Sequence, residues 1–472
     1  MPASPGAKFA RHEESKTLMT HADDYQIPVV FRDGKGPFNR ISNPNTLYDP
    51  RDPTRTIGPN RYSWDTVVTA RTPVNNKQTS LKEITALIDR AEENFAKSRH
   101  VYNLVALISG MPIQLRTNSP HLANFWGLNW YLGDLKEVER RLGKPPITIR
   151  AALDPTRDLN NPSDREALKP TAAAYFCPEN RQIVFINTDY YGQCKSWALG
   201  AAGVGLADFK IHSCHGACVE IDGTGMVIIA PTGTGKSTYT NWLARYGKIN
   251  SDDWVYIQKD GDKYFANPSE RYIYVRSNSV QDNPELGDDL SRIQTDPVMR
   301  QQYEIFERNP AENVPILNDR RVYNRVPNSR VMINPGEISP MSYQTPVNIV
   351  ILLRRDDVSP FMKELSTQEA VEVLRKGEFM VQAGATTNPA EIGTLKSESW
   401  YNPYLLAPDD HFEAERFAAL KDEGKAKYLI FNTSAIYGKK GANGKLDLGE
   451  LIERTGRIML DHVSEFTGKK YY

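Results

Sequence analysis

The sequence predicts a mixed α/β protein, and three observations lead to that prediction. Short apolar runs of strand length, bounded by turn residues, alternate along the chain with longer segments whose apolar residues recur at helical spacing. A glycine-rich loop at residues 230–235 stands between one such strand and one such helix. The composition, with 40% hydrophobic and 25% charged residues in a chain of 472, is typical of a globular protein with two or three domains.

The first part of the chain divides into an irregular arm and a region of mixed elements. Residues 1–60 are rich in proline, asparagine, aspartate and arginine and have neither helical nor strand periodicity, so they predict an arm without regular structure. Residues 61–215 predict a first domain. Its expected helices span residues 81–96 and 120–133, and its expected strands span residues 147–153, 172–176 and 182–187.

Residues 216–472 predict a second domain that contains the glycine loop. Its expected strands span residues 218–222, 226–229, 272–275, 347–353 and 428–432. Its expected helices span residues 238–245, 367–376, 412–422 and 448–466. Arg354 and Arg355, which precede two aspartates, are most simply a solvated strand end.

Charge and cysteine content limit the classes of partner and compartment. The 58 basic and 58 acidic side chains balance, which favours neither a nucleic acid nor a membrane surface as partner. The first residues have neither the apolar core of a signal peptide nor a run that could span a bilayer, so we expect a cytoplasmic protein. The four cysteines predict free thiols; a zinc site built from Cys194, Cys214 and a histidine is an alternative that no ligand spacing supports.

The loop Ala230-Pro-Thr-Gly-Thr-Gly-Lys-Ser-Thr238 predicts a phosphate site because strand, glycine loop and helix follow one another. Backbone N–H groups of such a loop point at phosphate oxygens, the lysine meets the β and γ phosphates, and the next hydroxyl holds Mg²⁺. Ala230 stands where the usual pattern has its first glycine, and a chance glycine-rich turn is the alternative. The predicted nucleotide-binding residues are Thr232, Gly233, Thr234, Gly235, Lys236, Ser237 and Thr238.

An acidic pair follows the next predicted strand. Asp252 and Asp253 come sixteen and seventeen residues after Lys236. Magnesium prefers few carboxylates together with phosphate oxygens, so this pair and Ser237 are the expected Mg²⁺ ligands. With Lys236 they would neutralise the charge on a transferred phosphoryl group. A solvated turn is the alternative for the acidic pair.

These motifs, read with their neighbours, resemble the phosphoenolpyruvate carboxykinase superfamily over most of the chain, closest to its ATP-dependent branch. The glycine loop and the acidic pair resemble the family's kinase-1 and kinase-2 elements. Residues 69–73 resemble its T-G-R-S-P element, and residues 191–196 resemble its Y-G-G-E-M-K-K element. Further similar stretches are residues 328–331 (N-T-R-V), 365–370 (L-T-x-E-Q-A), 383–386 (V-A-G-T-E) and 431–433 (V-N-T).

The resemblance implies a mixed-sheet, substrate-contacting N-terminal domain and a carboxykinase-type P-loop nucleotide-binding C-terminal domain. It implies that Arg71 binds a carboxylate of the acceptor, and that Lys195 and Arg330 neutralise the moving phosphoryl group. Thr455 would lie near the adenine, with helix packing as the alternative role. The implied cofactors are ATP and Mg²⁺, with Mn²⁺ as a further metal.

The chain also departs from this family. Ser196 replaces the second of two lysines, a ligand of the family's Mn²⁺, and a serine hydroxyl is a far weaker ligand. Gln193 replaces a glutamate, and the metal-binding histidine falls at His212, with His215 reached only by a shift in register. Decarboxylation of oxaloacetate needs that metal, whereas phosphoryl transfer does not.

A second resemblance covers residues 215–229, which are similar to the run that precedes the phosphate loop in HPr-type serine kinases. It implies that His215 lies beside the phosphates as an acid–base or electrophilic partner. It also implies that Asp252 is the base that receives a hydroxyl proton.

The function predicted from the sequence is therefore ATP-dependent phosphoryl transfer to a small, anionic, carboxylate-bearing acceptor. The predicted catalytic residues are Lys195, His215, Lys236, Asp252 and Arg330. One alternative is a working carboxykinase that converts oxaloacetate and ATP to phosphoenolpyruvate, CO₂ and ADP. The others are an HPr-type kinase with a protein substrate and an ATP-binding regulator without catalytic activity.

Overall fold

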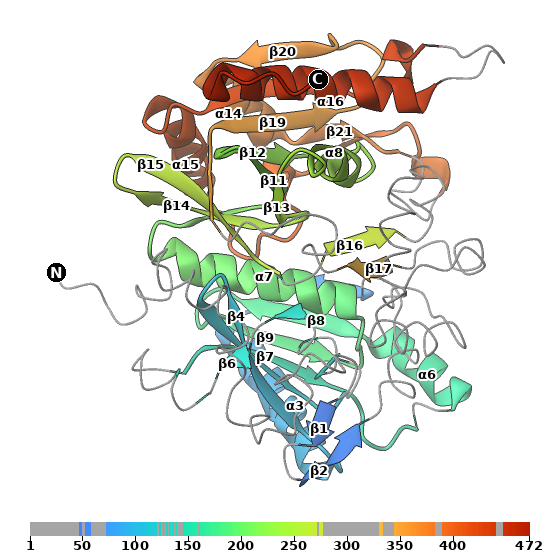
Figure 1. The fold of residues 1–472 in the computed structure, drawn as a ribbon. Coiled ribbons are helices and arrows are strands. Elements are labelled where there is room, and N and C mark those ends of the chain that lie inside the picture. The colour runs from blue at the N-terminus through green and yellow to red at the C-terminus, as the bar shows by residue number, and fades with distance from the viewer. Residues whose placement is uncertain are drawn as a thin grey trace. The chain divides into compact units, whose positions relative to one another are not determined.

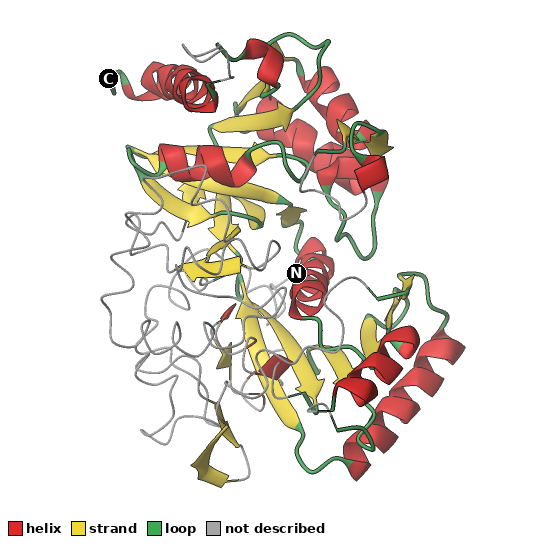
Figure 2. Cartoon of the chain, turned by 90° about the vertical axis from the view of Figure 1, so that its right-hand side faces the viewer, coloured by secondary structure: helices red, strands yellow, loops and turns green. Residues whose placement is uncertain are grey.

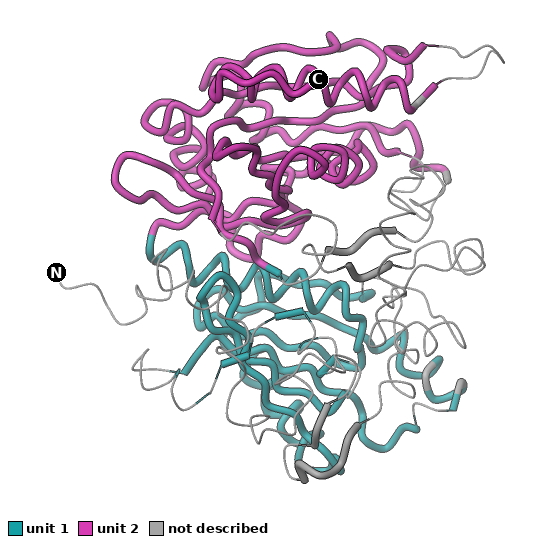
Figure 3. The backbone as a smooth tube through the Cα atoms, viewed as in Figure 1, with its two compact units in different colours: residues 1–209, 270–337 teal, residues 210–269, 338–472 magenta. Residues whose placement is uncertain are grey.

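The computed structural model describes residues 72–119, 145–158, 161–270, 344–382, 389–439 and 447–472, with shorter pieces at 47–49, 52–57, 273–276 and 330–333 and parts of 122–138. The protein is mixed α/β, as the sequence predicts (Figure 1). It divides into two compact units, one of residues 1–209 and 270–337 and the other of residues 210–269 and 338–472 (Figure 3).

The first unit contains a seven-stranded mixed sheet. Its order is β3-β8-β9-β7-β5-β4-β6, in which β5, β7 and β9 run parallel and the β4–β5 and β8–β9 pairs are antiparallel. The strands predicted at residues 147–153, 172–176 and 182–187 are confirmed as β7, β8 and β9. The bounds are β3 Val74–Asn76, β4 Tyr102–Ile108, β5 Met111–Thr117, β6 Leu132–Gly133, β7 Ile147–Ala152, β8 Ala173–Cys177 and β9 Gln182–Ile186.

Two long helices cover opposite faces of this sheet. Helix α3 (Leu81–Lys97), the helix predicted at residues 81–96, packs Phe95 into a core cluster with Val184 of β9. Helix α7 (Tyr191–Ala207) places the ring of Trp197 5.3 Å from that of Phe185, the next residue of β9. Successive residues of a strand point to opposite faces, so α3 and α7 lie on either side of β9. A shorter helix, α6 (Pro162–Leu168), precedes β8.

The second unit contains a six-stranded sheet of order β13-β11-β12-β19-β23-β20. Strands β12, β19 and β23 are parallel, and β11 is antiparallel to both β12 and β13. The carboxyl ends of β12, β13, β19 and β23 therefore lie at one edge, together with the start of β11. The bounds are β11 Gly216–Ile221, β12 Thr224–Ile229, β13 Lys248–Ser251, β19 Ile349–Arg354, β20 Met362–Leu365 and β23 Lys427–Asn432.

Helices cover both faces of the six-stranded sheet (Figure 2). Ile228 and Ile351 pack with α8 (Lys236–Leu243) and α16 (Leu448–Thr467). Their neighbours Val227 and Val350 share a core with residues of α14 (Thr367–Lys376), α15 (Asp410–Asp422) and a second, four-stranded sheet. That sheet has the order β10-β14-β15-β18, with bounds β10 His212–Cys214, β14 Val255–Asp260, β15 Lys263–Pro268 and β18 Thr345–Pro346.

Two sequence predictions of secondary structure need correction. Within the expected irregular arm, β1 (Leu47–Asp49) and β2 (Asp52–Ile57) form an antiparallel pair, because tyrosine, threonine and isoleucine favour strands. The helix predicted at residues 120–133 gives way at its end to strand β6. Smaller pairs are β16 (Ile273–Arg276) with β17 (Arg330–Ile333), and β21 (Glu378–Met380) with β22 (Leu395–Ser397).

Single 3₁₀ turns also lie at Lys169–Thr171, Pro389–Glu391, Ser399–Tyr401 and Ala435–Tyr437. Among the helices that the structure describes, none combines the length and apolar character needed to cross a bilayer.

Candidate functional site

The glycine loop joins β12 to α8 at the carboxyl edge of the six-stranded sheet, which confirms the predicted order of strand, loop and helix. Gly233 and Gly235 have φ angles of 87° and 109°, a region that side chains with a Cβ disfavour, so glycine is needed at both positions. The buried Thr234 donates its hydroxyl to the Pro231 carbonyl at 2.7 Å. Helix α8 begins at Lys236, and its first N–H groups therefore lie at the end of the loop.

Three side chains from separate elements meet beside this loop. The Lys236 Nζ lies 2.6 Å from Oδ1 of Asp253 and 3.0 Å from Nε2 of His215. The same Asp253 oxygen lies 3.2 Å from His215 Nε2. The topology explains the meeting, because β12 ends before the loop, β13 ends before the acidic pair and β11 begins after His215. The structure thus unites three residues that the sequence analysis singled out.

The orientation of His215 is fixed by a backbone carbonyl. Its Nδ1 lies 2.8 Å from the carbonyl oxygen of Tyr401, which can only accept, so Nδ1 carries the proton. In the neutral ring Nε2 is then an acceptor and faces the ammonium of Lys236. The rings of Trp254 and Tyr404 flank the imidazole at centroid distances of 5.9 and 5.6 Å. The site therefore holds one tautomer of His215 in an aromatic setting.

The turn that presents this carbonyl has an unusual backbone. Trp400 and Tyr401 have φ angles of 61° and 48°, in the left-handed region that residues other than glycine adopt at a cost. Both side chains are buried, and Trp400 stacks on Phe417 at 5.7 Å, which holds the turn in place. Packing therefore supports the strained conformation that positions His215.

The acidic pair divides into a buried and an accessible carboxylate. The Asp252 residue is only 5% exposed, whereas the Asp253 side chain is 34% exposed and contacts Lys236. Ser237, the second residue of α8, is partly exposed. Hydroxyl and carboxylate oxygens are the ligands that Mg²⁺ prefers when phosphates complete its coordination. Ser237 and Asp253 are therefore the residues beside the loop that could hold that ion.

His212 belongs to the core of the second unit. Its Nε2 lies 2.6 Å from Oε2 of Glu413 on α15, and its ring meets that of Phe417 edge-on at 4.3 Å. Both His212 and Glu413 are buried. Of the two histidines that the sequence left open, His215 is the one beside Lys236.

In the first unit Lys195 forms a sealed ion pair. Its Nζ lies 2.9 Å from Oε1 and 3.0 Å from Oε2 of Glu270, and the Asn129 amide donates to the same carboxylate at 2.9 Å. The side chains of Lys195 and Glu270 are only 9% and 2% exposed. Lys195 therefore neutralises a buried carboxylate.

Two segments that carry the carboxykinase resemblance meet at the start of α7. The Thr72 N–H donates to Oε1 of Gln193 at 2.9 Å, and the Gln193 amide donates to the Thr72 hydroxyl at 3.2 Å. The hydroxyl of Ser196 donates to the Gly192 carbonyl at 2.8 Å, within the helix. Arg71 precedes Thr72 but lies outside the described residues.

Arg330 and Thr455 are two further residues that the sequence assigns to the site. Arg330 is the first residue of β17 and pairs with Arg276 of β16, and its side chain is not among those described. Thr455 is fully buried in α16, where its hydroxyl donates to the Leu451 carbonyl at 2.7 Å and also bonds with the Tyr239 side chain of α8. Thr455 thus takes part in packing between α16 and α8.

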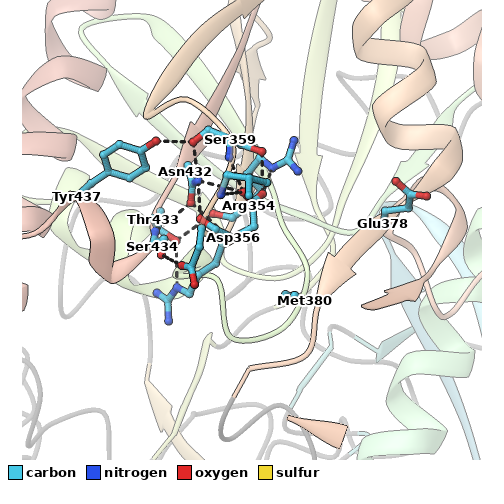
Figure 4. Close-up of polar contacts among 12 residues, drawn as sticks. Arg354, Asp356, Ser359, Glu378, Met380, Asn432, Thr433, Ser434 and Tyr437 are labelled. Atoms are coloured by element: carbon cyan, nitrogen blue, oxygen red, sulfur yellow. Dashed lines mark hydrogen bonds and ion pairs between the residues drawn. The ribbon is translucent and has the colours of Figure 1, made fainter. Parts of the chain in front are cut away.

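Arg355 and Thr433, which the sequence did not assign to the site, also lie beside the loop. Thr433, at the end of β23, donates its hydroxyl to the carbonyl of Thr234 in the glycine loop at 2.7 Å. The partly buried Arg355 donates its Nε to the Thr433 hydroxyl at 3.3 Å. Only Arg354, whose Nε lies 2.5 Å from Asp356, behaves as a solvated strand end (Figure 4). The V-N-T resemblance at residues 431–433 was the one sequence signal for this contact.

All four cysteines are free and buried. Burial raises the pKa of the Cys194, Cys214 and Cys218 thiols far above the usual value, which keeps them neutral. Among the described residues, no group of three or more histidine, cysteine, aspartate or glutamate side chains is placed to hold a metal ion. The zinc alternative therefore has no support from the cysteine surroundings.

No model of a known protein family matches the chain, and no curated protein matches it in sequence. The residues of the site and the resemblances described above are therefore the basis for assigning a function.

Proposed function

We propose that this protein transfers the γ-phosphoryl group of ATP to a small carboxylate-bearing acceptor, as a divergent enzyme of the carboxykinase type. One observation carries the proposal. Lys236 lies between Asp253 and His215, at 2.6 and 3.0 Å, at the end of a loop with two left-handed glycines. A lysine and backbone N–H groups that converge at a helix start bind phosphate in many proteins.

On the nucleotide side, Asp253 holds Lys236 in position until phosphate arrives. The Asp253 side chain is 34% exposed, so Lys236 can exchange this partner for a phosphate oxygen without opening the core. The N–H groups of the loop and of the first turn of α8 would bind the other phosphate oxygens. Mg²⁺, when bound with ATP, supplies further neutralisation of phosphate charge, and Ser237 and Asp253 are its proposed ligands.

On the acceptor side, the proposal depends on the resemblance together with one contact in the first unit. The hydrogen bonds between Thr72 and Gln193 join the two segments of that unit that resemble the substrate-binding elements of carboxykinases. We assign carboxylate binding to Arg71 and neutralisation of the phosphoryl group to Arg330. Because Lys195 neutralises Glu270, we assign Lys195 to support of these segments.

The carboxykinase alternative needs a transition metal beside the acceptor, and Ser196 is a poor ligand for one. Ser196 donates its hydroxyl to the Gly192 carbonyl, and His212 binds Glu413 in the core of the other unit. The Ser196 hydroxyl is thus engaged within its own helix and is a weak metal ligand, whereas the buried Nδ1 of His212 has no hydrogen-bond partner among the described residues. The serine in place of a lysine ligand is therefore the observation that favours phosphoryl transfer without decarboxylation.

A protein serine kinase of the HPr type is the second candidate, because one observation favours it. His215 and Asp253 share the immediate surroundings of Lys236, as the second resemblance implies for a histidine and a base. In that reaction Asp253, rather than the expected Asp252, would receive the proton of a substrate hydroxyl, since Asp253 is the accessible carboxylate.

A ³¹P NMR time course tests these alternatives. The purified protein is incubated with ATP, Mg²⁺ and a trace of Mn²⁺, with oxaloacetate or with a panel of small hydroxy acids. ADP together with a new phosphoester of a hydroxy acid supports the proposal, whereas phosphoenolpyruvate formed only with oxaloacetate supports the carboxykinase. Phosphoserine in an added protein supports the HPr-type kinase. ATP that is bound but unchanged under all conditions contradicts phosphoryl transfer and supports a regulator.

The matched variants are Lys236→Ala and Lys363→Ala. Lys363 lies on β20, where it pairs with the exposed Glu369 at 2.5 Å. Product formation should be lost in the first variant and retained in the second, which removes the same charge from the same unit.

A further inference from the structure

The carboxyl ends of β19 and β23 bring a second cation to the glycine loop. Strands β12, β19 and β23 are neighbours in the sheet, so the residues that follow each of them lie side by side. Arg355 follows β19, and Thr433 follows β23. The Thr433 hydroxyl donates to the Thr234 carbonyl at 2.7 Å and accepts from Arg355 Nε at 3.3 Å. The Thr433 hydroxyl therefore connects Arg355 to the backbone of the glycine loop.

Arg355 has unused hydrogen-bonding capacity. Within the part of the chain that the structure describes, no carboxylate pairs with Arg355, and Thr433 is the one acceptor of its guanidinium. Its neighbour Arg354, by contrast, pairs with Asp356 at 2.5 Å. Burial lowers the pKa of Arg355, and the nearby Tyr239 offsets only part of this effect. The remaining N–H groups of Arg355 suit a planar anion such as a phosphate.

The turn that carries Arg355 is rigid. Asn432, which is fully buried, donates its amide to the carbonyls of Asp356 at 2.8 Å and Ser359 at 3.0 Å (Figure 4). Asn432 also accepts from the N–H of Ser434 at 3.0 Å. The ends of β19 and β23 are thus tied together by a side chain in the core, which limits the positions that Arg355 can adopt.

We propose that Arg355 binds a phosphate group of the nucleotide, on the side of the glycine loop that faces β19. This inference rests on the proposed function, because it gives the nucleotide site a second cation. Lys236 would approach the phosphates from the β13 side, where Asp253 lies, and Arg355 from the β19 side. Thr433 would then link phosphate binding at Arg355 to the loop carbonyl of Thr234.

The test is calorimetric titration of the full-length protein with Mg·ADP and, separately, with adenosine. Arg355→Gln should weaken ADP binding by about 10-fold or more, because charge-assisted hydrogen bonds to phosphate are stronger than neutral ones. Adenosine, which has no phosphate, should bind Arg355→Gln and the native protein equally. Arg355→Lys keeps the charge but loses the planar fork, and should give an intermediate affinity. Arg157→Gln is the control for general charge, since the exposed Arg157 pairs with Asp164 in the first unit.

The outcomes separate this inference from the proposed function. If the native protein binds ADP, Lys236→Ala does not, and Arg355→Gln binds as the native protein does, then the role of Arg355 is wrong and the nucleotide site stands. Equal losses for ADP and adenosine would mean a contact with the base or sugar and would also overturn the proposal. A native protein that binds no ADP contradicts the proposed function itself. Thermal unfolding of each variant without ligand checks the fold, and Arg355→Lys is the variant of choice if Arg355→Gln fails to fold.

Discussion

Each unit of the molecule contains a lysine that pairs with a carboxylate, and the two pairs differ in their access to solvent. In the first unit Lys195 and Glu270 are 9% and 2% exposed. In the second, Lys236 is 11% exposed but its partner Asp253 is 34% exposed. The lysines are almost equally buried, so the carboxylates make the difference.

That difference determines what each pair can do. A ligand that replaced Glu270 would leave a charge sealed inside the unit, and an uncompensated buried charge is costly. A ligand that replaced Asp253 would leave a carboxylate that water or a metal ion can still solvate. The Lys195–Glu270 pair is therefore suited to a structural role. In the Lys236–Asp253 pair, beside the glycine loop, the lysine is suited to exchange its carboxylate partner for a ligand.

The largest expected effect is on turnover. Lys236→Ala should lower the rate of phosphoryl transfer by about 10³- to 10⁵-fold, because a cation that neutralises the transferred group is worth that much in such reactions. Its unfolding midpoint should change little, since Asp253 remains solvated. Product formation by ³¹P NMR and urea unfolding measure the two quantities. If Lys236→Ala unfolded at a much lower urea concentration than the native protein, Lys236 could not exchange Asp253 for a ligand without loss of stability, which would contradict the interpretation.

The opposite pattern is expected for Lys195→Ala. Removal of this lysine leaves Glu270 charged and buried, which should destabilise the protein by about 3–5 kcal/mol. Urea unfolding, followed by fluorescence, measures the change. Lys169→Ala is the matched control, because Lys169 pairs with Glu166 on the surface of the same unit, where an ion pair contributes about 0–1 kcal/mol. If the two substitutions lowered the free energy of unfolding equally, the Lys195–Glu270 pair would contribute no more to stability than a surface ion pair.

The exchangeable pair was largely predictable from the sequence. Local patterns identified the strand before the loop, the loop glycines and the helix after it, because each depends on neighbouring residues. The spacing also placed an acidic pair after the next strand. The choice of Asp253 over Asp252 needed the structure, since it depends on which of two adjacent side chains faces Lys236.

The sealed pair was not predictable, because its parts are far apart in the chain. Asn129, Lys195 and Glu270 come from three distant segments, and no local pattern links them. Helix α7 was missed for a related reason. It is buried on all sides and rich in glycine and alanine, so it has no amphipathic period that would mark it as a helix. Thr433 and Arg355 likewise became neighbours only through the parallel pairing of β19 and β23.

A smaller effect is expected from Arg71→Ala, which tests the acceptor side. The KM for the acceptor should rise by about 10- to 100-fold, because a charged hydrogen-bonded pair with a carboxylate is lost. The turnover number at saturation and the affinity for ADP should stay close to the native values, since the loop and Lys236 are intact. Steady-state kinetics with varied acceptor measure both constants. An unchanged KM would contradict the assignment of Arg71 to the acceptor carboxylate.

The smallest expected effect concerns a carboxylate of intermediate exposure, Asp356, whose side chain is 15% exposed. Burial favours a higher pKa for Asp356, but N–H groups of Ser359 and Val358, the Ser359 hydroxyl and Arg354 outweigh it and lower that pKa. The charged form is therefore the one that stabilises the fold. The stabilisation by charged Asp356 is complete at pH values above about 3.9, the pKa of aspartate in the unfolded chain. It is lost as the pH falls through the lower pKa that Asp356 has in the folded protein.

Asp356→Asn should accordingly reduce stability by about 1 kcal/mol near neutral pH, and the gap to the native protein should narrow in acid as the native carboxylate takes up a proton. Urea midpoints at pH 7 and below pH 4 give the comparison. Asp260→Asn, at the exposed end of β14, is the control. A gap that stays constant with pH would mean that Asp356 acts through its shape and hydrogen bonds alone. The charge of this carboxylate would then add nothing to the support of Arg355, and Asn432 would be the main anchor of that turn.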